Sequence, residues 1–151
     1  MAIRTMRTGD DPLLRKRSRE VEKIDERIIT LLDDLADTLH ASENGAAISA
    51  CQVGVLKRVV VIDFGDGPLE LINPMLIGAS GEQVCMEGCL SFPGRFGETV
   101  RPLKVTVQAL DRFGVDRLLE GEGELAKCFC HELDHLDGIL FLDRLLNHSP
   151  D

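Results

Sequence analysis

Residues 130–138 read Cys-His-Glu-Leu-Asp-His-Leu-Asp-Gly, and they contain the pattern H-E-x-x-H. Successive residues of an α-helix are rotated by about 100°, so positions four apart differ by only about 40°. His131 and His135 therefore share one helix face, where two imidazoles can hold a single metal ion. Glu132 lies about 100° from His131 around the helix axis. Its carboxylate can therefore take a proton from a water bound to that metal.

The pattern H-E-x-x-H also occurs by chance in surface helices, so the residues around it matter. Here the histidines adjoin an apolar stripe, which predicts that they lie at the edge of the core rather than in open water. That stripe comprises Leu125, Cys128, Phe129 and Leu136. Gly138 predicts the end of the helix. Because catalytic zinc-type sites usually have three protein ligands and one open position, we expect a third ligand elsewhere in the chain.

Length and charge narrow the class of protein. The chain has 151 residues, which predicts a single domain over residues 1–151. Its net charge of -9 argues against nucleic acid as a direct partner, because phosphate binding requires a basic surface. No run approaches the roughly 18 apolar residues of a membrane span, and the N-terminus lacks the apolar core of a signal peptide. We therefore expect a cytoplasmic protein without a membrane partner.

Hydrophobic periodicity predicts helices towards both ends of the chain, with strands between them. Asp25 is expected to cap a helix that runs to about residue 42, and another helix is expected over about 122–137. Asp10-Asp11-Pro12 predicts a short helix, and Asn73-Pro74 is expected to break a strand. Strands or extended chain are expected over 59–64, 69–73, 75–84, 105–110 and 115–119. These hairpins predict an α+β fold in which antiparallel strands pack around the C-terminal helix carrying H-E-x-x-H.

The third metal ligand is sought among the cysteines. The chain has five of them: Cys51, Cys85, Cys89, Cys128 and Cys130. An odd number in a reducing compartment argues against a disulfide framework, and each can simply be a small buried side chain. Cys89 can complete a Cys-His-His site with His131 and His135. The rival is a structural site built from Cys85 and Cys89 with Cys128 and Cys130, although the last two differ by about 200° on a helix.

Three motifs resemble those of the peptide deformylase family. Residues 45–52 read Gly-Ala-Ala-Ile-Ser-Ala-Cys-Gln, where the family has G-φ-G-φ-A-A-P-Q. Residues 87–91 read Glu-Gly-Cys-Leu-Ser, which matches E-G-C-L-S. Residues 130–135 read Cys-His-Glu-Leu-Asp-His, where the family has Q-H-E-x-D-H. The resemblance covers nearly the whole chain, and the second and third motifs at this separation are specific.

The resemblance implies a metal-dependent hydrolase that removes the formyl group from the N-terminal formyl-methionine of newly made polypeptides. It implies Fe2+ as the cofactor, with Zn2+, Ni2+ or Co2+ able to substitute, held by Cys89, His131 and His135. The implied partners are N-formyl-methionyl peptides and, transiently, the ribosome. Members that dock on the ribosome can use a C-terminal helix, and little of this chain follows Leu146 to form one.

The resemblance also implies roles for individual residues. Glu132 would transfer the proton, while the Gln52 side-chain amide and the Leu90 backbone N–H would stabilise an oxyanion. Glu87 would pair with an arginine, for which Arg101 is the candidate. The loop after Gly45 would align the substrate backbone as an added strand. The implied substrate-binding residues are Gly45, Ala46, Ala47, Gly88 and Cys128.

The first motif departs from the family pattern, within a stretch of small residues from Asn44 to Gly54 that predicts a tight loop. Ala47 replaces a glycine, and a positive φ there would cost about 1 kcal/mol. Ser49 replaces an alanine and needs a partner if buried. Cys51 replaces a proline, which would leave the loop more mobile.

Glu124 stands near the expected methionine pocket, where the family commonly has leucine. Together with the altered loop, it leaves two alternatives open. One is a divergent paralogue with an altered N-acyl substrate. The other is a metal-binding but catalytically weak peptide-binding protein.

Overall fold

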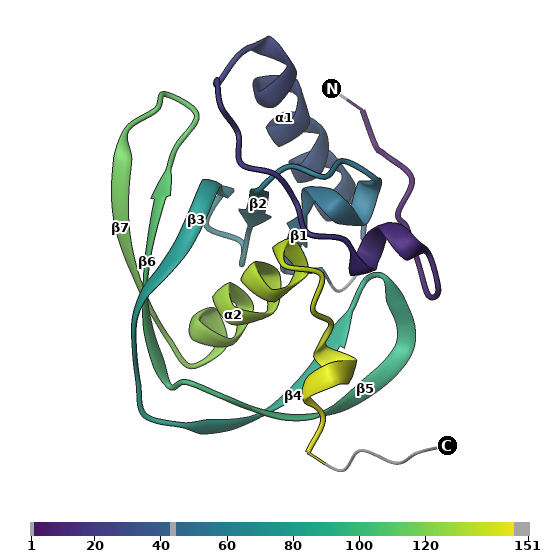
Figure 1. Cartoon of the computed structure of the whole chain (residues 1–151), viewed down its shortest axis with the longest axis vertical. Coiled ribbons are helices and arrows are strands. Elements are labelled where there is room, and N and C mark those ends of the chain that lie inside the picture. The colour runs from purple at the N-terminus through teal and green to yellow at the C-terminus, as the bar shows by residue number, and fades with distance from the viewer. Residues whose placement is uncertain (1, 43–44, 147–151) are drawn as a thin grey trace.

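The computed structural model describes residues 2–42 and 45–146, and the architecture is α+β with antiparallel sheets (Figure 1). A five-stranded sheet has the order β1-β2-β3-β6-β7, and a separate hairpin pairs β4 with β5. Neighbouring strands pair antiparallel in both sheets. The strands are β1 (Ala47–Ser49), β2 (Val59–Ile62), β3 (Leu69–Ser80), β4 (Gln83–Cys89), β5 (Phe92–Arg101), β6 (Lys104–Leu110) and β7 (Asp116–Glu122).

The helix α2 (Glu124–Leu136) lies in the middle of the molecule and contacts strands of both sheets (Figure 1). Its apolar side packs on the five-stranded sheet, where Phe129 and Leu136 have no solvent exposure and join Val60 and Val107 in one core cluster. Burying such a side chain contributes about 1.5–3 kcal/mol. Gly138 follows the helix with a φ of 75°, and a Cβ there would collide with the Arg15 carbonyl. The end of the helix is therefore fixed by glycine, as its position predicted.

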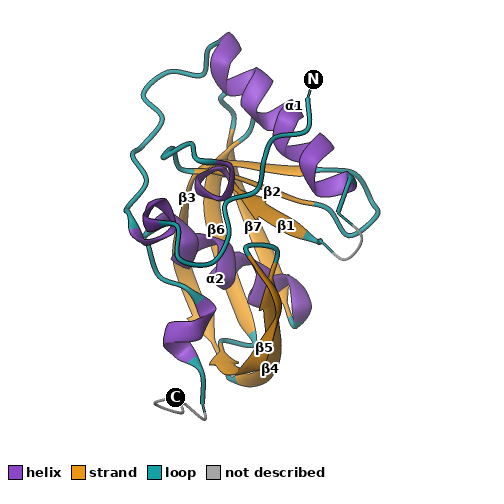
Figure 2. Ribbon diagram, turned by 90° about the vertical axis from the view of Figure 1, so that its right-hand side faces the viewer, coloured by secondary structure: helices purple, strands orange, loops and turns teal. Residues whose placement is uncertain are grey.

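The helix α1 (Glu26–His40) lies at the end of the molecule opposite the β4–β5 hairpin (Figure 2). The Asp25 carboxylate accepts hydrogen bonds from the backbone N–H groups of Arg27 and Ile28, which confirms the predicted cap. Leu32 and Leu35 are fully buried against the sheet. The helix ends two residues earlier than expected. In the described ranges, no helix combines the length and the apolarity needed to cross a membrane.

The prediction that Asn73-Pro74 breaks a strand was wrong. β3 runs through both residues, with a shift of register against β6 between Ile72 and Met75. Asn73 has a φ of 51°, and its side-chain amide pairs with the backbone N–H and C=O of Val21 at 2.8 and 2.9 Å. Because the chain is already irregular there, the missing N–H of Pro74 costs no ladder hydrogen bond.

Other boundaries also differ from the sequence prediction. The stretch expected to be a loop contains β1 and the 3-10 helix η2 (Ala50–Val53), and its first residue, Asn44, lies outside the described residues. The short N-terminal helix is the 3-10 helix η1 (Pro12–Arg15). The segment 87–89, which falls outside the strands expected from the sequence, belongs to β4 because it pairs with β5. These pairings place Cys89 at the end of a strand beside α2.

Candidate active site

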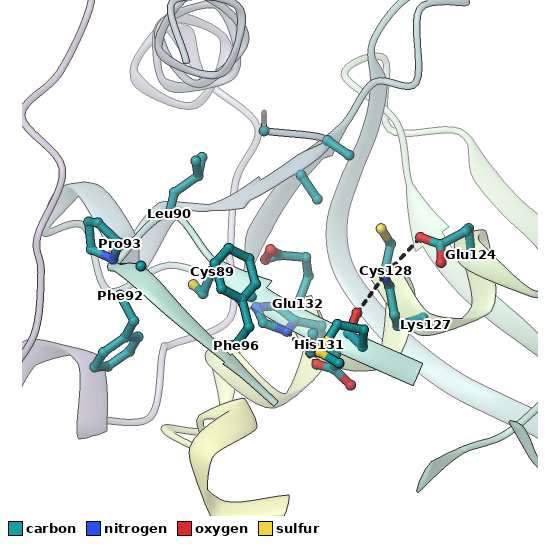
Figure 3. A pocket seen from close by; sticks show the side chains of 17 residues that line it. Cys89, Leu90, Phe92, Pro93, Phe96, Glu124, Lys127, Cys128, His131 and Glu132 are labelled. Atoms are coloured by element: carbon teal, nitrogen blue, oxygen red, sulfur yellow. Dashed lines mark hydrogen bonds and ion pairs between the residues drawn. The ribbon is translucent and has the colours of Figure 1, made fainter. Parts of the chain in front are cut away.

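A cleft of about 670 Å³ lies between β1, the turn from β4 to β5, and one face of α2 (Figure 3). Its wall on the sheet side includes Gly45, Ala46 and Ala47. Cys89 faces it from the end of β4, and His131 and Glu132 face it from α2. Residues from all three motifs therefore meet in one cleft.

The three expected metal ligands come together. One ligand atom from each of Cys89, His131 and His135 lies within 4.8 Å of the other two. The two imidazole centroids are 5.0 Å apart, as the i, i+4 spacing requires. The Cys89 Sγ lies 3.2 Å from the His135 Nε2. The rival arrangement of four cysteines does not form within the described residues, where this is the one group of at least three potential ligands.

The chemistry of this donor set fits a divalent transition metal. One thiolate and two imidazoles suit iron, cobalt, nickel and zinc ions and do not by themselves select among them. Burial lowers the pKa of His135 to about 3, so its imidazole is neutral, as a ligand must be. Within the described residues, the buried Nδ1 of His135 has no hydrogen-bond partner.

The second nitrogen of His131 is held by a carboxylate. Its Nδ1 lies 2.7 Å from the Glu87 Oε1, which directs Nε2 towards the cleft. Burial alone would lower the pKa of His131, but its interactions with Cys89 and Glu87 raise it to about 10. In the protein without metal this imidazole therefore attracts a proton, and a bound cation would replace that positive charge.

Glu87 is itself held in place, and its partner is the arginine that the sequence suggested. Arg101 donates to both carboxylate oxygens, from Nε at 2.5 Å and from Nη2 at 2.9 Å, and the Thr99 hydroxyl donates as well. Burial alone would raise the pKa of Glu87, but these partners and His131 hold it well below its usual range. A fixed, ionised carboxylate therefore orients His131.

Glu132 lies beside these ligands and is only 2% exposed. Its Oε2 has no hydrogen-bond partner among the described residues. Burial raises the pKa of the carboxyl to about 7. A carboxyl with such a pKa can both accept and release a proton near neutral pH.

The Gln52 amide points its nitrogen into the site. Nε2 lies 3.5 Å from the Cys89 Sγ and 3.2 Å from the Ser91 Oγ. Its Oε1 accepts hydrogen bonds from the backbone N–H and the hydroxyl of Ser49, at 2.9 and 3.1 Å. Ser49 is fully buried and has the partner that its hydroxyl needs. This departure from the family motif therefore adds a hydroxyl hydrogen bond to the one that the backbone N–H already gives Gln52.

The other departures in the first motif fit without strain. Ala47 pairs with Ile62 as part of β1, and Asn73 is the one non-glycine residue with positive φ in the described part of the chain. The expected strain at Ala47 is therefore absent. Cys51 is fully buried, and its thiol contacts the His135 carbonyl oxygen at 3.6 Å, which ties this loop to α2.

The remaining predicted residues also line the cleft, namely Gly88, Leu90 and Cys128. Burial raises the pKa of Cys128 to about 12, so its sulfur stays a neutral thiol. Several further lining residues, among them Lys127 and Phe96, were not among the predicted substrate-binding residues. Lys127 forms an ion pair with Glu124 at 2.8 Å (Figure 3), and its position four residues before His131 was the available signal. Phe96 is 70% exposed and covers Gly88, where a Cβ would lie only 2.6 Å from its ring.

Comparison with known proteins agrees with this geometry. The model of the family Polypeptide deformylase matches residues 3–150. The chain is 55% identical to Peptide deformylase 2 of Clostridium acetobutylicum over 143 residues, covering 95% of each chain. It is 56% identical to a Peptide deformylase of Acetivibrio thermocellus over 146 residues, covering 97% of this chain and 85% of the relative.

Solved structures give the same result. The crystal structure of peptide deformylase from Thermotoga maritima superposes with a TM-score of 0.91 at 37% identity, covering 98% of this chain and 99% of the other. The structure of peptide deformylase from Ehrlichia chaffeensis in complex with actinonin superposes with a TM-score of 0.93 at 39% identity, covering 97% and 91%. The chain therefore belongs to the polypeptide deformylase family.

Proposed function

We propose that this protein is a metal-dependent hydrolase that removes the formyl group from the N-terminal formyl-methionine of newly made polypeptides. The observation that carries the proposal is the buried Glu132 carboxylate beside the Cys89-His131-His135 group, at the base of a cleft in a chain of this family. Such polypeptides are made in the cytoplasm, where this protein would act, and any contact with the ribosome would be transient.

Cys89, His131 and His135 would hold the cation. When bound, a divalent cation lowers the pKa of water and polarises a carbonyl group. The family implies Fe2+ as the resident metal, with Zn2+, Ni2+ or Co2+ as substitutes, and a thiolate with two imidazoles suits all four. Metal analysis of protein purified without oxygen tests this choice, since thiolate-bound iron oxidises readily.

Glu132 would move the proton in this reaction. A C–O bond forms between a water oxygen and the formyl carbon, and the C–N bond of the formamide then breaks. Glu132 accepts the proton that the water loses and passes it to the departing amine, so that formate and a free N-terminus result. Its burial and its pKa of about 7 support both halves of this transfer.

Gln52 and Leu90 would stabilise the negative charge on the formyl oxygen. The Gln52 Nε2 already points towards Cys89, and Ser49 holds the other end of the amide, so no reorientation is needed during the reaction. Leu90 lies at the turn directly after Cys89 and lines the cleft, so its backbone N–H is the second candidate donor. Two preorganised donors are typical of an oxyanion site.

The substrate backbone would pair with β1. β1 is an edge strand of the five-stranded sheet, and Gly45, Ala46 and Ala47 line the cleft beside it. An extended peptide can therefore add to this edge as a further strand. Gly88 on the opposite wall and Cys128 on α2 would complete the binding site around the first residue of the peptide.

The decisive experiment measures formate release from formyl-Met-Ala-Ser by Fe2+-loaded protein under anaerobic conditions. Acetyl-Met-Ala-Ser is the control substrate, and its hydrolysis would reveal an altered N-acyl preference. We expect Glu132→Ala to reduce turnover by about 10²–10⁴-fold while metal content is unchanged. Glu26→Gln, on the exposed first turn of α1, is the matched control and should behave as wild type. Wild-type turnover by Glu132→Ala would exclude the proposed base.

A further inference from the structure

The 3-10 helix η3 (Phe141–Arg144) follows α2 and packs beside His131. The Phe141 ring is 1% exposed and stacks on the His131 imidazole, with centroids 6.0 Å apart and planes inclined by 25°. A second aromatic ring, that of Phe92, meets Phe141 edge-on at 6.2 Å and 77°. The face of one metal-ligand imidazole is thus covered by an aromatic ring that is itself held from the side.

Arg144 is connected to the same imidazole indirectly, through hydrogen bonds between charged side chains. Its Nε and Nη2 donate to the two Asp134 oxygens at 2.5 and 3.1 Å. Asp134 also accepts a hydrogen bond from the Arg101 Nη1 at 2.8 Å, and Arg101 donates two hydrogen bonds to Glu87. Because the Glu87 Oε1 lies 2.7 Å from the His131 Nδ1, an unbroken series of hydrogen bonds joins η3 to that nitrogen.

The segment that carries these two residues is anchored independently of His131. The Leu146 N–H donates to the Glu98 carbonyl oxygen at 2.8 Å, and Leu145 forms a β-bridge with Thr99. Asp143 pairs with Arg15 of η1 at 2.5 Å. Contacts to β5 and to η1 therefore hold η3 in place. The helix thus provides a fixed packing surface beside the imidazole.

We propose that Phe141 and Arg144 are positioning residues for the metal site, and that η3 sets the orientation of His131. Stacking restricts rotation of the ring, while Arg144 restricts Asp134, which shares Arg101 with Glu87, the carboxylate that holds Nδ1. Partners outside the ligand set commonly change metal affinity by about 10–100-fold, because they fix the orientation and basicity of a ligand. This inference rests on the proposed metal site, but it does not depend on which acyl group the enzyme removes.

The test measures the binding of Co2+, without any peptide substrate, by variants of the whole chain. Affinity is measured by competition with a chelator, and ligand geometry by the visible absorption bands of bound Co2+. We expect Phe141→Leu and Arg144→Met each to weaken Co2+ binding by about 10-fold or more and to shift the bands. Arg144→Lys should recover part of the affinity, because it keeps the charge and loses the bidentate contact.

A matched control separates positioning from general destabilisation. Leu32→Ala opens a cavity under α1, in the other part of the core, and should leave the affinity and the spectrum of folded protein unchanged. If Phe141→Leu and Arg144→Met bind Co2+ with wild-type affinity and spectrum, the proposal is overturned. Should Phe141→Leu not fold, the partly exposed Arg144 still provides the test.

The outcome is distinguishable from failure of the proposed function. Wild-type protein that binds Co2+ but releases no formate would refute the deformylase activity and leave this inference open to the same binding measurement. Wild-type protein that binds no divalent cation would refute both.

Discussion

Two arginine–carboxylate clusters in this molecule share their chemistry and differ in their surroundings. The inner cluster comprises Glu87, Arg101, Asp134 and Arg144, and the outer cluster comprises Asp33, Glu70 and Arg112. In each cluster, one guanidinium donates two hydrogen bonds to a glutamate and one to an aspartate. The Arg101 side chain is 4% exposed, whereas that of Arg112 is 29% exposed.

The comparison shows that ion pairs of the same composition can have different roles, depending on how far water reaches them. Water screens the charges of the outer cluster, so breaking its ion pairs would cost little free energy. The Glu87–Arg101 pair at the centre of the inner cluster is closed off from water, and removing either partner would leave the other charge buried without compensation. Only the inner cluster is connected to a potential metal ligand, through Glu87 and His131. Burial therefore turns an ordinary ion pair into a rigid support for the site.

The largest effect is expected when the inner cluster loses its arginine. In Arg101→Met, Glu87 and Asp134 keep their charges without the shared guanidinium. The free energy of unfolding should fall by about 3–5 kcal/mol. Urea denaturation of metal-free protein measures the change. A loss below about 1 kcal/mol would mean that water reaches these carboxylates and that the cluster is not closed.

A smaller change tests the connection to the metal site. Glu87→Gln keeps the shape of the side chain but removes the charge that fixes the His131 imidazole. Metal affinity should fall by about 10–100-fold, as measured with Zn2+ and a competing chelator. Glu70→Gln is the matched variant in the outer cluster, and it should bind Zn2+ as wild type does. Equal affinities in both variants would show that the inner cluster does not act on the ligand.

The inner cluster should also depend on pH. The pKa of Glu87 in the folded protein is held below its usual value of 4.5, so the unfolded chain binds this proton more readily. The stabilisation is therefore complete above about pH 4.5 and is lost as pH falls towards the lower folded value. The difference in unfolding free energy between metal-free wild type and Glu87→Gln should shrink over that range. A difference that stays constant from pH 7 to pH 3 would contradict this.

Local spacing explains which parts of the site could be predicted. His131 and His135 share a helix face because of the helical repeat, which depends on no distant residue. Cys89 was one of two alternatives that the cysteines offered for a metal site, and the family resemblance selected it and assigned the role of Gln52, since no rule of spacing brings a strand end and a 3-10 helix together. The fold class followed from the succession of hairpins, and the antiparallel sheets confirm it.

The features that escaped prediction depend on contacts between distant segments. Asn73 continues a strand because its amide pairs with Val21, more than fifty residues away along the chain. Phe141 lies in a mainly apolar stretch after the last expected helix, and only the fold places its ring on His131. Arg144 is joined to Glu87 through Asp134 of α2 and Arg101 of β5. Burial and pairing of this kind are tertiary properties, which periodicity does not encode.

The smallest effect is expected in the outer cluster. Arg112→Met removes the guanidinium that Glu70 and Asp33 share, but water surrounds all three side chains in part. The free energy of unfolding should fall by about 0–1 kcal/mol, and Zn2+ affinity should not change. Because screening acts on exposed charges, 1 M salt should remove most of this loss while leaving that of Arg101→Met largely intact. A loss above about 2 kcal/mol that persists in salt would mean that the outer cluster is as closed to water as the inner one, and burial would no longer explain the difference between them.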